Sequence, residues 1–256
     1  MAMHTIPELF LDQVKSQPEK VAVHVKRNGE FQPLTWSDLH QDVRRFVANL
    51  NRLGVQQGDR VVQFSENRYE WILLDLAIHI LGAVHVPVHS TLSGSQVVEQ
   101  AVDSGAQILI VSNQALQDKL TSGDPLPDNI AVHAFEATGQ FQGKDVPLFD
   151  QPAENLDAVV ALEESVSERI TEDSYATILY TSGTTGEPKG VILNQRNITT
   201  NSLGANAMIA QQPGDLRLNF LPLSHIFART CDLYGWIASG SQLAIAESRD
   251  TVIPDA

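Results

Sequence analysis

Residues with the chemistry to bind an anion gather in the segment from Thr181 to Gly190. Within these ten residues lie four hydroxyl side chains, three glycines and one lysine, in the order Thr-Ser-Gly-Thr-Thr-Gly-Glu-Pro-Lys-Gly. Glycine backbone can approach a ligand closely and adopt positive φ, so consecutive N–H groups can line an anion-binding concavity. The hydroxyls add donors, and Lys189 adds a mobile positive charge. This combination predicts a site for a polyphosphate.

The segment differs from the P-loop of many nucleotide-binding proteins. That pattern needs a glycine, four residues and then Gly-Lys-Ser/Thr, whereas Lys189 stands between Pro188 and Gly190. On composition alone, the segment could also be a flexible hairpin loop rich in Ser, Thr and Gly. The run from Tyr175 to Tyr180 predicts an apolar strand that leads directly into it.

A second stretch, from Leu221 to Arg229, reads Leu-Pro-Leu-Ser-His-Ile-Phe-Ala-Arg. His225 stands where a helix is expected to begin, and Arg229 follows in that helix. A single histidine at a helix start is usually a capping or buried residue, so residue type alone does not make His225 a ligand. For Arg229 the functional and structural interpretations remain equally open.

The elements that position these stretches alternate between strands and helices. Apolar and β-branched runs predict strands, and apolar residues at steps of three and four predict helices. The expected order is strands at 21–25 and near 31, helix 39–53, strand 60–64, helix 69–81, strand 84–88, helix 96–103, strand 107–111, strands 175–180 and 191–193, a helix from 197, strand 216–221, a helix from 225 and strand 242–246. This alternation implies right-handed crossovers. The expected fold class is α/β, with doubly wound, mostly parallel sheets and flanking helices.

Local turn and capping signals support two of these elements. Asn28-Gly29 between apolar runs predicts a tight turn between paired strands. Thr35 predicts a helix N-cap, with Asp38 in the capping-box position. Gly54 predicts the end of that helix, because the left-handed conformation costs little only for glycine.

Residues 123–173 interrupt the alternation with four prolines and an acidic stretch that includes Glu163 and Glu164. We interpret them as a surface connection with short elements, whose acidic side chains form a solvated face. The connection suggests two parts of the chain. The expected division is an N-terminal α/β lobe with the acidic connection at 1–172, and the start of a second α/β lobe with the phosphate segment at 173–256.

Composition excludes several classes of function. The formal charge of −14 and the lack of a Lys/Arg cluster argue against nucleic-acid binding, so an anion must be held by local donors. The single cysteine allows no internal disulfide and no Cys-based zinc site. The first residues lack the pattern of a signal peptide. The longest apolar stretch, Trp71 to Val88, is broken by Asp75, His79, His85 and Pro87, so the expected compartment is the cytoplasm.

The remaining histidines and the tryptophans receive structural interpretations. His85 and His89 are four residues apart on a strand broken by Pro87, which is poor metal-ligand geometry, and the other histidines show no partner pattern. The three tryptophans fall on apolar helical faces and are expected in the core; they are Trp36, Trp71 and Trp236.

The segment from Thr181 to Gly190 resembles the phosphate-loop signature Thr-Ser-Gly-Thr-Thr-Gly-x-Pro-Lys-Gly of the adenylate-forming (AMP-binding) superfamily. This superfamily includes acyl-CoA synthetases, luciferases and nonribosomal-peptide adenylation domains. Three further stretches resemble its motifs in the same order, namely residues 34–39, 82–88 and 103–106. Leu221 to His225 resembles the "Leu-Pro-Leu-x-His" motif, and His-Ile-Phe-x-Arg is most similar to long-chain fatty acyl-CoA synthetases. The resemblance spans nearly the whole chain.

The resemblance implies an activity that needs ATP, Mg²⁺ and CoA. A fatty acid would be converted to an acyl-adenylate and then to acyl-CoA, with electrostatic stabilisation and Mg²⁺ contributing most of the catalysis. It implies His225 and Lys189 as catalytic residues, with His225 beside the carboxylate, and Thr184 near the metal. The residues implied in phosphate binding are Thr181, Ser182, Gly183, Thr184, Thr185, Gly186 and Lys189. Alternatives are another adenylating enzyme, such as an acyl-AMP ligase or an amino-acid adenylation domain, and a non-catalytic nucleotide-binding module.

Relatives in this superfamily also use residues that this sequence does not contain. These are a Thr-Glu motif, a ribose-binding Asp, a hinge and a small C-terminal domain with a catalytic Lys. We therefore expect the chain to be an N-terminal fragment of a longer enzyme and inactive alone. The resemblance is compatible with peripheral membrane contact and with a homo-oligomer, and it assigns no nucleic-acid partner.

Overall fold

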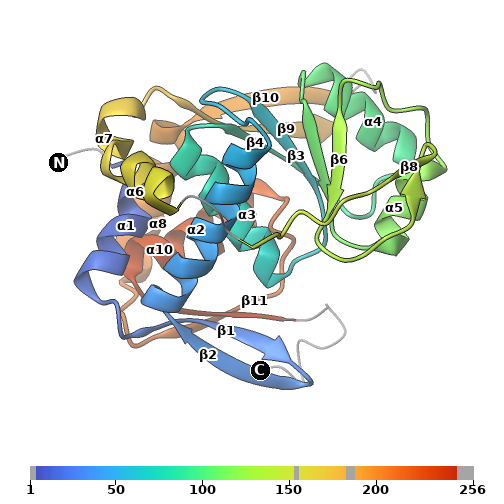
Figure 1. Cartoon of the computed structure of the whole chain (residues 1–256). Coiled ribbons are helices and arrows are strands. Elements are labelled where there is room, and N and C mark those ends of the chain that lie inside the picture. The colour runs from blue at the N-terminus through green and yellow to red at the C-terminus, as the bar shows by residue number, and fades with distance from the viewer. Residues whose placement is uncertain (1–3, 153–155, 183–187, 247–256) are drawn as a thin grey trace.

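A six-stranded sheet forms the centre of the molecule (Figure 1). The structure, a computed structural model, describes residues 4–152, 156–182 and 188–246. Across the sheet the strands run in the order β10 (Pro188–Asn194), β9 (Tyr175–Ser182), β4 (Val84–Val88), β3 (Arg60–Phe64), β5 (Ile108–Val111) and β6 (Ala131–Ala134). Only the β9–β10 pairing at one edge is antiparallel, and the other four pairings are parallel.

A second sheet of four strands packs below the first in Figure 1. Its order is β11 (Leu216–Asn219), β12 (Gln242–Ile245), β1 (Val21–Arg27) and β2 (Glu30–Thr35). The β1–β2 pair is antiparallel and the other two pairs are parallel. The predicted turn is confirmed, since Asn28 and Gly29 both have positive φ. The predicted α/β class is likewise confirmed, with mostly parallel sheets that each contain one antiparallel pairing.

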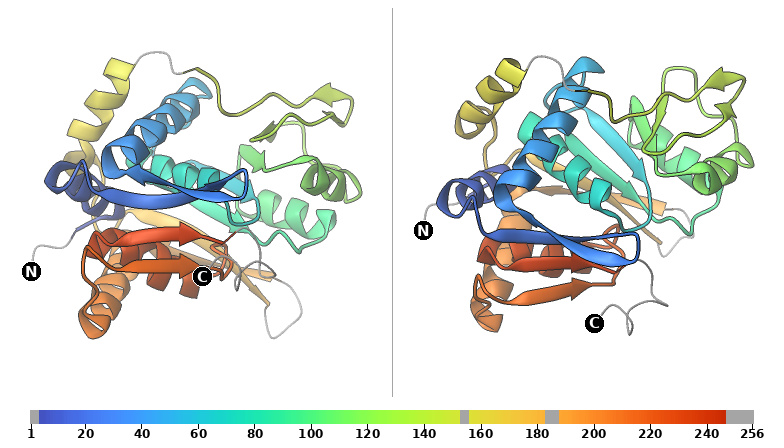
Figure 2. Two further views of the ribbon diagram at one scale, coloured as in Figure 1. Left: turned by 90° about the horizontal axis from the view of Figure 1, so that it is seen from below. Right: turned by 60° about the horizontal axis from the view of Figure 1, so that its bottom comes forward.

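Helices cover both faces of the six-stranded sheet, and some of them fill the space between the two sheets (Figure 2). They are α1 (Ile6–Ser16), α2 (Trp36–Arg52), α3 (Tyr69–Leu81), α4 (Gly94–Asp103), α5 (Gln114–Thr121), α6 (Leu156–Glu164), α7 (Val166–Arg169), α8 (Gln195–Ile209), α9 (Ile226–Ala228), the π-helix η1 (Arg229–Tyr234) and α10 (Gly235–Ser239). A small hairpin, β7 (Gln140–Phe141) and β8 (Lys144–Asp145), stands apart from both sheets.

Helix α2 forms where its capping residues predict. The Thr35 side chain accepts a hydrogen bond from the backbone of Asp38, and the Asp38 carboxylate accepts one from Thr35 N at 2.9 Å. These bonds satisfy N–H groups that have no partner within the helix. Gly54 follows the last turn with a φ of +82°, as predicted.

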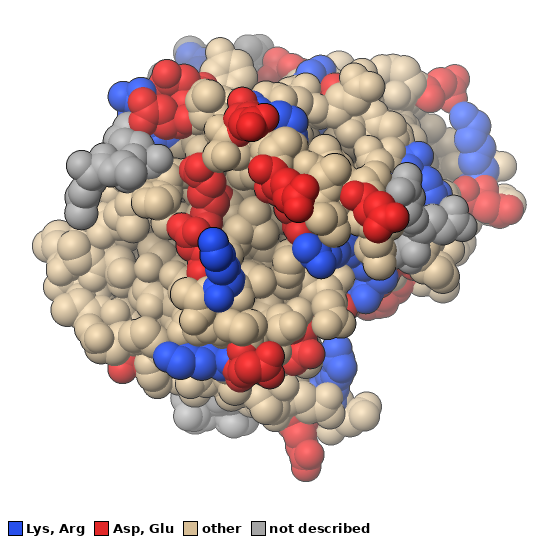
Figure 3. Space-filling view, turned by 60° about the vertical axis from the view of Figure 1, so that its left-hand side comes forward, with Lys and Arg blue, Asp and Glu red and all other residues tan. Residues whose placement is uncertain are grey.

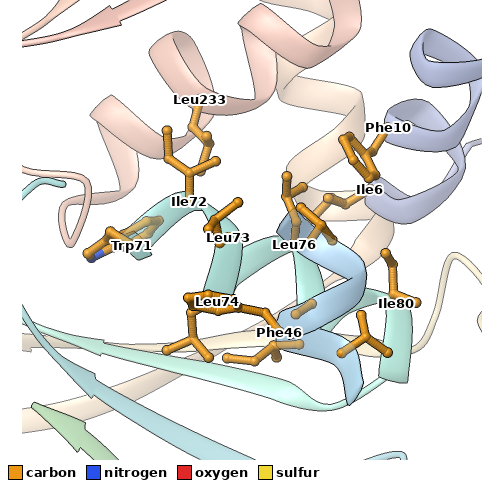
Figure 4. Close-up of a cluster of buried hydrophobic side chains, with 14 of the residues drawn as sticks. Ile6, Phe10, Phe46, Trp71, Ile72, Leu73, Leu74, Leu76, Ile80 and Leu233 are labelled. Carbon is orange, nitrogen blue, oxygen red and sulfur yellow. The ribbon is translucent and has the colours of Figure 1, made fainter. Parts of the chain in front are cut away.

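Helix α3 is the most deeply buried helix, and it positions the site residues described below. Of its 13 residues, only Glu70 is not buried. Its Trp71, Leu73 and Leu76 belong to the apolar cluster in Figure 4, which also includes Phe10 from α1 and Leu233 from η1. A helix that is apolar on all sides must lie inside the protein, because it has no face suited to water.

The predicted core position of the tryptophans is confirmed, since all three are fully buried. Trp36 of α2 stacks on Trp236 of α10 with ring centroids 5.1 Å apart. The Trp236 indole donates a hydrogen bond to Ala22 O of β1 at 2.9 Å. The four-stranded sheet is thereby held to the helices that lie between the sheets.

Residues 123–173 are more ordered into the fold than the sequence suggests. They contribute β6, which extends the large sheet, and α6, which packs on α2. The prediction of a solvated acidic face is wrong for Glu163, which is only 9% exposed. Its carboxylate pairs with Arg44 at 2.6 Å and with His40 at 2.8 Å. The positive charge of Arg44 and the hydrogen bond with His40, both from helix α2, allow this acidic residue to be buried.

The division into lobes at residue 172 stays a prediction about how the chain is organised. Strands from both sides of that position share each of the two large sheets. None of the helices in the described ranges is both long and apolar enough to cross a bilayer. On the face drawn in Figure 3, basic side chains lie singly or beside acidic ones, as the net charge of −14 leads one to expect.

Two glycine-to-alanine substitutions test how closely the backbone of α4 packs. A Cβ at Gly94 would overlap the carbonyl oxygen of Lys119 and the backbone of Gly123. We expect Gly94→Ala to lower the free energy of unfolding by about 2 kcal/mol or more. Gly204→Ala is the matched control, because Gly204 lies in α8 with open space around its Cα. It should raise that free energy by about 0.5–1 kcal/mol. Urea denaturation measures both, and equal effects would contradict the predicted overlap.

Candidate functional site

The segment predicted to bind phosphate forms the end of the β9–β10 hairpin. Thr181 pairs directly across from Lys189, so the two side chains leave the hairpin on the same face. Both residues are exposed. Ser182 ends β9, and Pro188 pairs with it at the start of β10. The residues Gly183, Thr184, Thr185 and Gly186, which are predicted to contact phosphate or metal, lie outside the described residues.

Gly190 has a packing role in the hairpin. It pairs with Tyr180, and a Cβ there would come within 3.3 Å of the Tyr180 ring and 2.9 Å of the Ile178 side chain. The Tyr180 hydroxyl donates to Asp103 of α4 at 2.6 Å. Composition groups Gly190 with the other two glycines of the segment, although the resemblance implies only Gly183 and Gly186 in phosphate binding. The structure instead shows Gly190 making room for an aromatic ring that anchors the hairpin to α4.

A pocket of about 460 Å³ opens beside this hairpin. It brings together the carboxyl end of β4, the start of α4, the end of β9 and the loop before α9. Its lining residues are Pro87, His89, Leu92, Gln96, Gln100, Leu179, Tyr180, Thr181, Pro188, Ser224, His225 and Ile226. The two stretches selected from the sequence, Thr181 to Gly190 and Leu221 to Arg229, therefore meet at one pocket.

His225 is the exposed N-cap residue of α9 and lines this pocket. Its Nδ1 atom accepts a hydrogen bond from Phe227 N at 3.2 Å. In a neutral imidazole whose Nδ1 is an acceptor, the proton lies on Nε2. His225 is thus both the capping residue that its position suggests and a potential donor to an oxygen in the pocket.

His89 and Ser224 are site residues that the sequence analysis missed. His89 Nδ1 lies 2.8 Å from Ser224 Oγ, and the rings of His89 and His225 are 6.2 Å apart. Burial lowers the pKa of His89, and the neighbouring His225 lowers it further. The sequence did hold a signal, because His89 directly follows a parallel strand, and ligands bind at the carboxyl ends of such strands.

Asn67 holds the loop that carries Ser224 and His225. Its amide nitrogen donates to Leu221 O at 2.7 Å, and its amide oxygen accepts from Leu223 N at 2.8 Å. The loop has no regular partners for these backbone groups, so the side chain supplies them. Asn67 follows β3, the strand next to β4, and thereby sets the loop against the sheet.

Arg229 lies in the core, beneath the pocket, with no exposed surface. Its Nη2 atom pairs with Asp75 Oδ1 of α3 at 2.6 Å and donates to the Tyr234 hydroxyl at 2.7 Å. Its Nη1 atom donates to Thr177 Oγ1 of β9 at 2.8 Å. The guanidinium also lies 5.6 Å from the centre of the Trp71 ring. This settles the question left open by the sequence, since Arg229 cannot touch a ligand in the pocket.

Two buried histidines complete the group around Asp75. His85 Nδ1 is 2.7 Å from Asp75 Oδ1, and His79 Nε2 is 3.0 Å from the Tyr234 hydroxyl. Gln195 of α8 reaches His79 Nδ1 at 3.3 Å. We call these residues, together with Arg229 and Thr177, the buried polar cluster. Its signal in the sequence was the set of polar residues that interrupts the apolar stretch from Trp71 to Val88.

Opposite charges meet inside the buried polar cluster. Burial alone would raise the pKa of Asp75, but the positive charge of Arg229 and hydrogen bonds from the histidines hold it well below its ordinary value. Burial lowers the pKa of His85 to about 4, against the hydrogen bond to Asp75, which raises it. At neutral pH, therefore, one carboxylate faces one guanidinium and His85 is uncharged.

The donors at the pocket suit an anionic ligand. Within its lining, Thr181 offers a hydroxyl and His225 an imidazole N–H. Lys189 does not line the pocket, but it pairs with Thr181 on the hairpin beside it and offers an ammonium group. Hydroxyl and ammonium groups are common phosphate donors. Among the described residues, no three His, Cys, Asp or Glu side chains gather to hold a metal ion. Mg²⁺ commonly takes one or two carboxylates together with nucleotide phosphates, so it would depend on the ligand here.

Most of the chain matches a known protein family. Residues 10–256 match the family model described as AMP-binding enzyme. The long-chain-fatty-acid–CoA ligase FadD15 of Mycobacterium bovis is 32% identical over 236 residues. The match covers 89% of this chain and 38% of that protein, so the chain spans well under half the length of this relative.

Solved structures share the fold. A Rhodopseudomonas palustris protein described as a long-chain-fatty-acid CoA ligase has a TM-score of 0.78 at 21% identity, over 99% of this chain and 60% of that one. The N-terminal subdomain of Klebsiella oxytoca NpsA, in complex with 3-hydroxybenzoyl-AMSN, has a TM-score of 0.69 at 22% identity. That match covers 94% of this chain and 53% of that one. These likenesses extend to the fold alone.

The burial of His85 in the buried polar cluster predicts that the free energy of unfolding decreases as the pH is lowered. The pKa of His85 is about 4 in the folded chain and 6.5 as its ordinary value, so the unfolded state binds a proton first as the pH falls. The stability is therefore complete above pH 6.5 and decreases towards pH 4, by on the order of 3 kcal/mol. Asp75 titrates below this range, because its pKa is held well below 3.8.

His85→Asn isolates the effect, because asparagine can donate to Asp75 but does not titrate. Urea denaturation at pH 7 and pH 4 should show a smaller loss of unfolding free energy in the variant than in the wild type. The same loss in both proteins would show that His85 is not the group responsible.

Proposed function

The chain belongs to the AMP-binding enzyme family, and from this premise we propose that the protein containing it activates a fatty acid with ATP and transfers the acyl group to CoA. The observation that carries the proposal is the meeting of Thr181 and His225 at one pocket. One comes from the hairpin with the phosphate-binding composition. The other presents a donor to an oxygen about to react. Adenylate formation needs both functions at one place.

The proposed reaction has two steps, each with a defined leaving group. An oxygen of the fatty acid carboxylate attacks the α-phosphorus of ATP, and the bond to pyrophosphate breaks. The thiol of CoA then attacks the acyl carbon of the adenylate, AMP leaves, and the thiol proton passes to solvent. A carboxylate has no good leaving group of its own, which is why activation must come first.

Thr181, His225 and the neighbouring Lys189 each have a proposed part in the first step. Lys189 and Thr181 hold the phosphates that leave as pyrophosphate, and the lysine charge offsets the negative charge that grows there. His225 donates Nε2–H to an oxygen of the carboxylate or of the α-phosphate and so orients it. Mg²⁺, when bound to the phosphates, supplies further positive charge, and Thr184 is the residue that we propose beside it.

A long acyl chain is the substrate class that we propose. Two observations support it: the stretch from His225 to Arg229, and the description of a 32% identical relative as a long-chain-fatty-acid–CoA ligase. The neighbouring NpsA structure, which carries an aryl ligand, keeps aryl acid activation as the competing outcome to be tested.

Replacing Lys189 should test the proposed phosphate contact. In the full-length protein, Lys189→Ala should lower the rate of ATP–pyrophosphate exchange by on the order of 10² or more, because it removes charge stabilisation in the transition state. Lys144→Ala is the matched control. Lys144 lies exposed on the small β7–β8 hairpin, where it pairs with Asp128. An unchanged exchange rate in Lys189→Ala would remove the assignment.

A panel of carboxylic acids should test the substrate class. With the full-length protein, ATP–pyrophosphate exchange should be faster with palmitate than with acetate, 3-hydroxybenzoate or an amino acid. Formation of a CoA thioester from the preferred acid would support the second step. Preference for the aryl or amino acid would overturn the fatty acid proposal, and adenylate formation without thioester would indicate an acyl-AMP ligase.

A further inference from the structure

The buried polar cluster connects the two stretches that meet at the pocket. Thr177 lies on β9, four residues before Thr181, and Arg229 lies four residues after His225. Arg229 Nη1 donates to Thr177 Oγ1 at 2.8 Å, and Arg229 N donates to His225 O at 3.1 Å. One residue is therefore bonded both to the strand that carries the hairpin and to the N-cap residue of α9.

The orientation of the Thr177 hydroxyl is determined by its partners. It accepts from Arg229 and donates to His85 O at 2.7 Å, and Thr177 also pairs with His85 across β9 and β4. The hydroxyl is fully buried. With one donor and one acceptor in place, it has no second arrangement in which both bonds survive.

A local distortion of the helix brings the guanidinium and the tyrosine to the same carboxylate. Arg229 and Tyr234 both contact Asp75, although they are five residues apart. In a regular α-helix such residues point about 140° apart. The π-helical turn η1 spans these residues and places both on one face. π-Helical turns of this kind are often found at functional sites.

Apolar side chains in place of the ion pair would hold these elements together without the free-energy cost of removing charges from water. Burying an ion pair removes two charges from water, and well-packed apolar residues of similar volume are often at least as stabilising. The ion pair adds geometric specificity, because each hydrogen bond forms only when its partner atom is correctly placed. The cluster joins α3, β4, β9 and η1 by such bonds.

We infer that the contact of Arg229 with Asp75 and Thr177 is a positioning device that sets His225 against the phosphate-binding hairpin. Arg229 and Thr177 are positioning residues, since both are fully buried and neither lines the pocket. The inference rests on the proposed function. It assigns to this cluster the relative placement of the carboxylate-binding and phosphate-binding groups during adenylate formation.

Thr177→Val tests this inference, because it removes the hydroxyl and keeps the shape of the side chain. Thr199→Val is the matched control. Thr199 is also a buried threonine, and its hydroxyl donates only to Gln195 O within α8, at 3.0 Å. Thr177→Ser is the conservative variant, since it restores the hydroxyl. All three are made in the full-length protein and followed by ATP–pyrophosphate exchange with palmitate and by thermal unfolding.

The expected result separates positioning from stability. Thr177→Val should lower kcat about tenfold or more with little change in KM for ATP, because misplaced groups mainly affect the transition state. Thr199→Val should keep both constants within about twofold at a similar shift of Tm, and Thr177→Ser should recover most of the rate. Equal kinetic losses in the two valine variants, or no recovery with serine, would overturn the inference while leaving the proposed function in place. Absence of exchange in the wild type would overturn both.

Discussion

The ion pair between Asp75 and Arg229 is the constraint on which much of this structure depends. Both side chains are fully buried, and a buried charge is tolerated only where an opposite charge and hydrogen bonds offset its desolvation. Helix α3 must therefore carry a carboxylate in an otherwise apolar surface, and η1 must turn with a wider period to meet it. The helix that follows His225 cannot move relative to α3 without breaking this pairing. The sheet beside it is bound through Thr177 and His85.

The pocket is made at the place where parallel strands end and their connections diverge. Strands β4 and β9 are parallel neighbours, and residues at or just beyond their carboxyl ends, His89 and Thr181, line it. Chain segments far apart in sequence supply the opposite wall through Ser224 and His225. Asn67, after a third strand, holds that wall by bonding to its backbone. The arrangement places exposed donors above a buried base.

A protein with a net charge of −14 must bind an anion against its own overall field. The proposed site would meet this field with local donors. Lys189 and Thr181 leave the hairpin on one face, and in the buried polar cluster the Asp75 carboxylate is paired with the Arg229 guanidinium. Short-range donors outweigh distant acidic side chains, because salt screens interactions between exposed charges beyond about 10 Å.

What the sequence by itself determined was local. The periodicity of 39–53, the caps at Thr35 and Gly54, the Asn28-Gly29 turn and the strand–helix alternation each depend on neighbours within a few residues, and each matches the structure. The motif from Thr181 to Gly190 is contiguous, so it could be recognised from the sequence, and its phosphate-binding role stays a prediction. Tertiary structure decided the rest. Glu163 can be buried because it pairs with Arg44, which lies 119 positions away in sequence. Arg229 can join the core because it pairs with Asp75, which lies 154 positions away. Burial and pairing depend on which distant segments the fold brings together, and a local pattern does not contain that information.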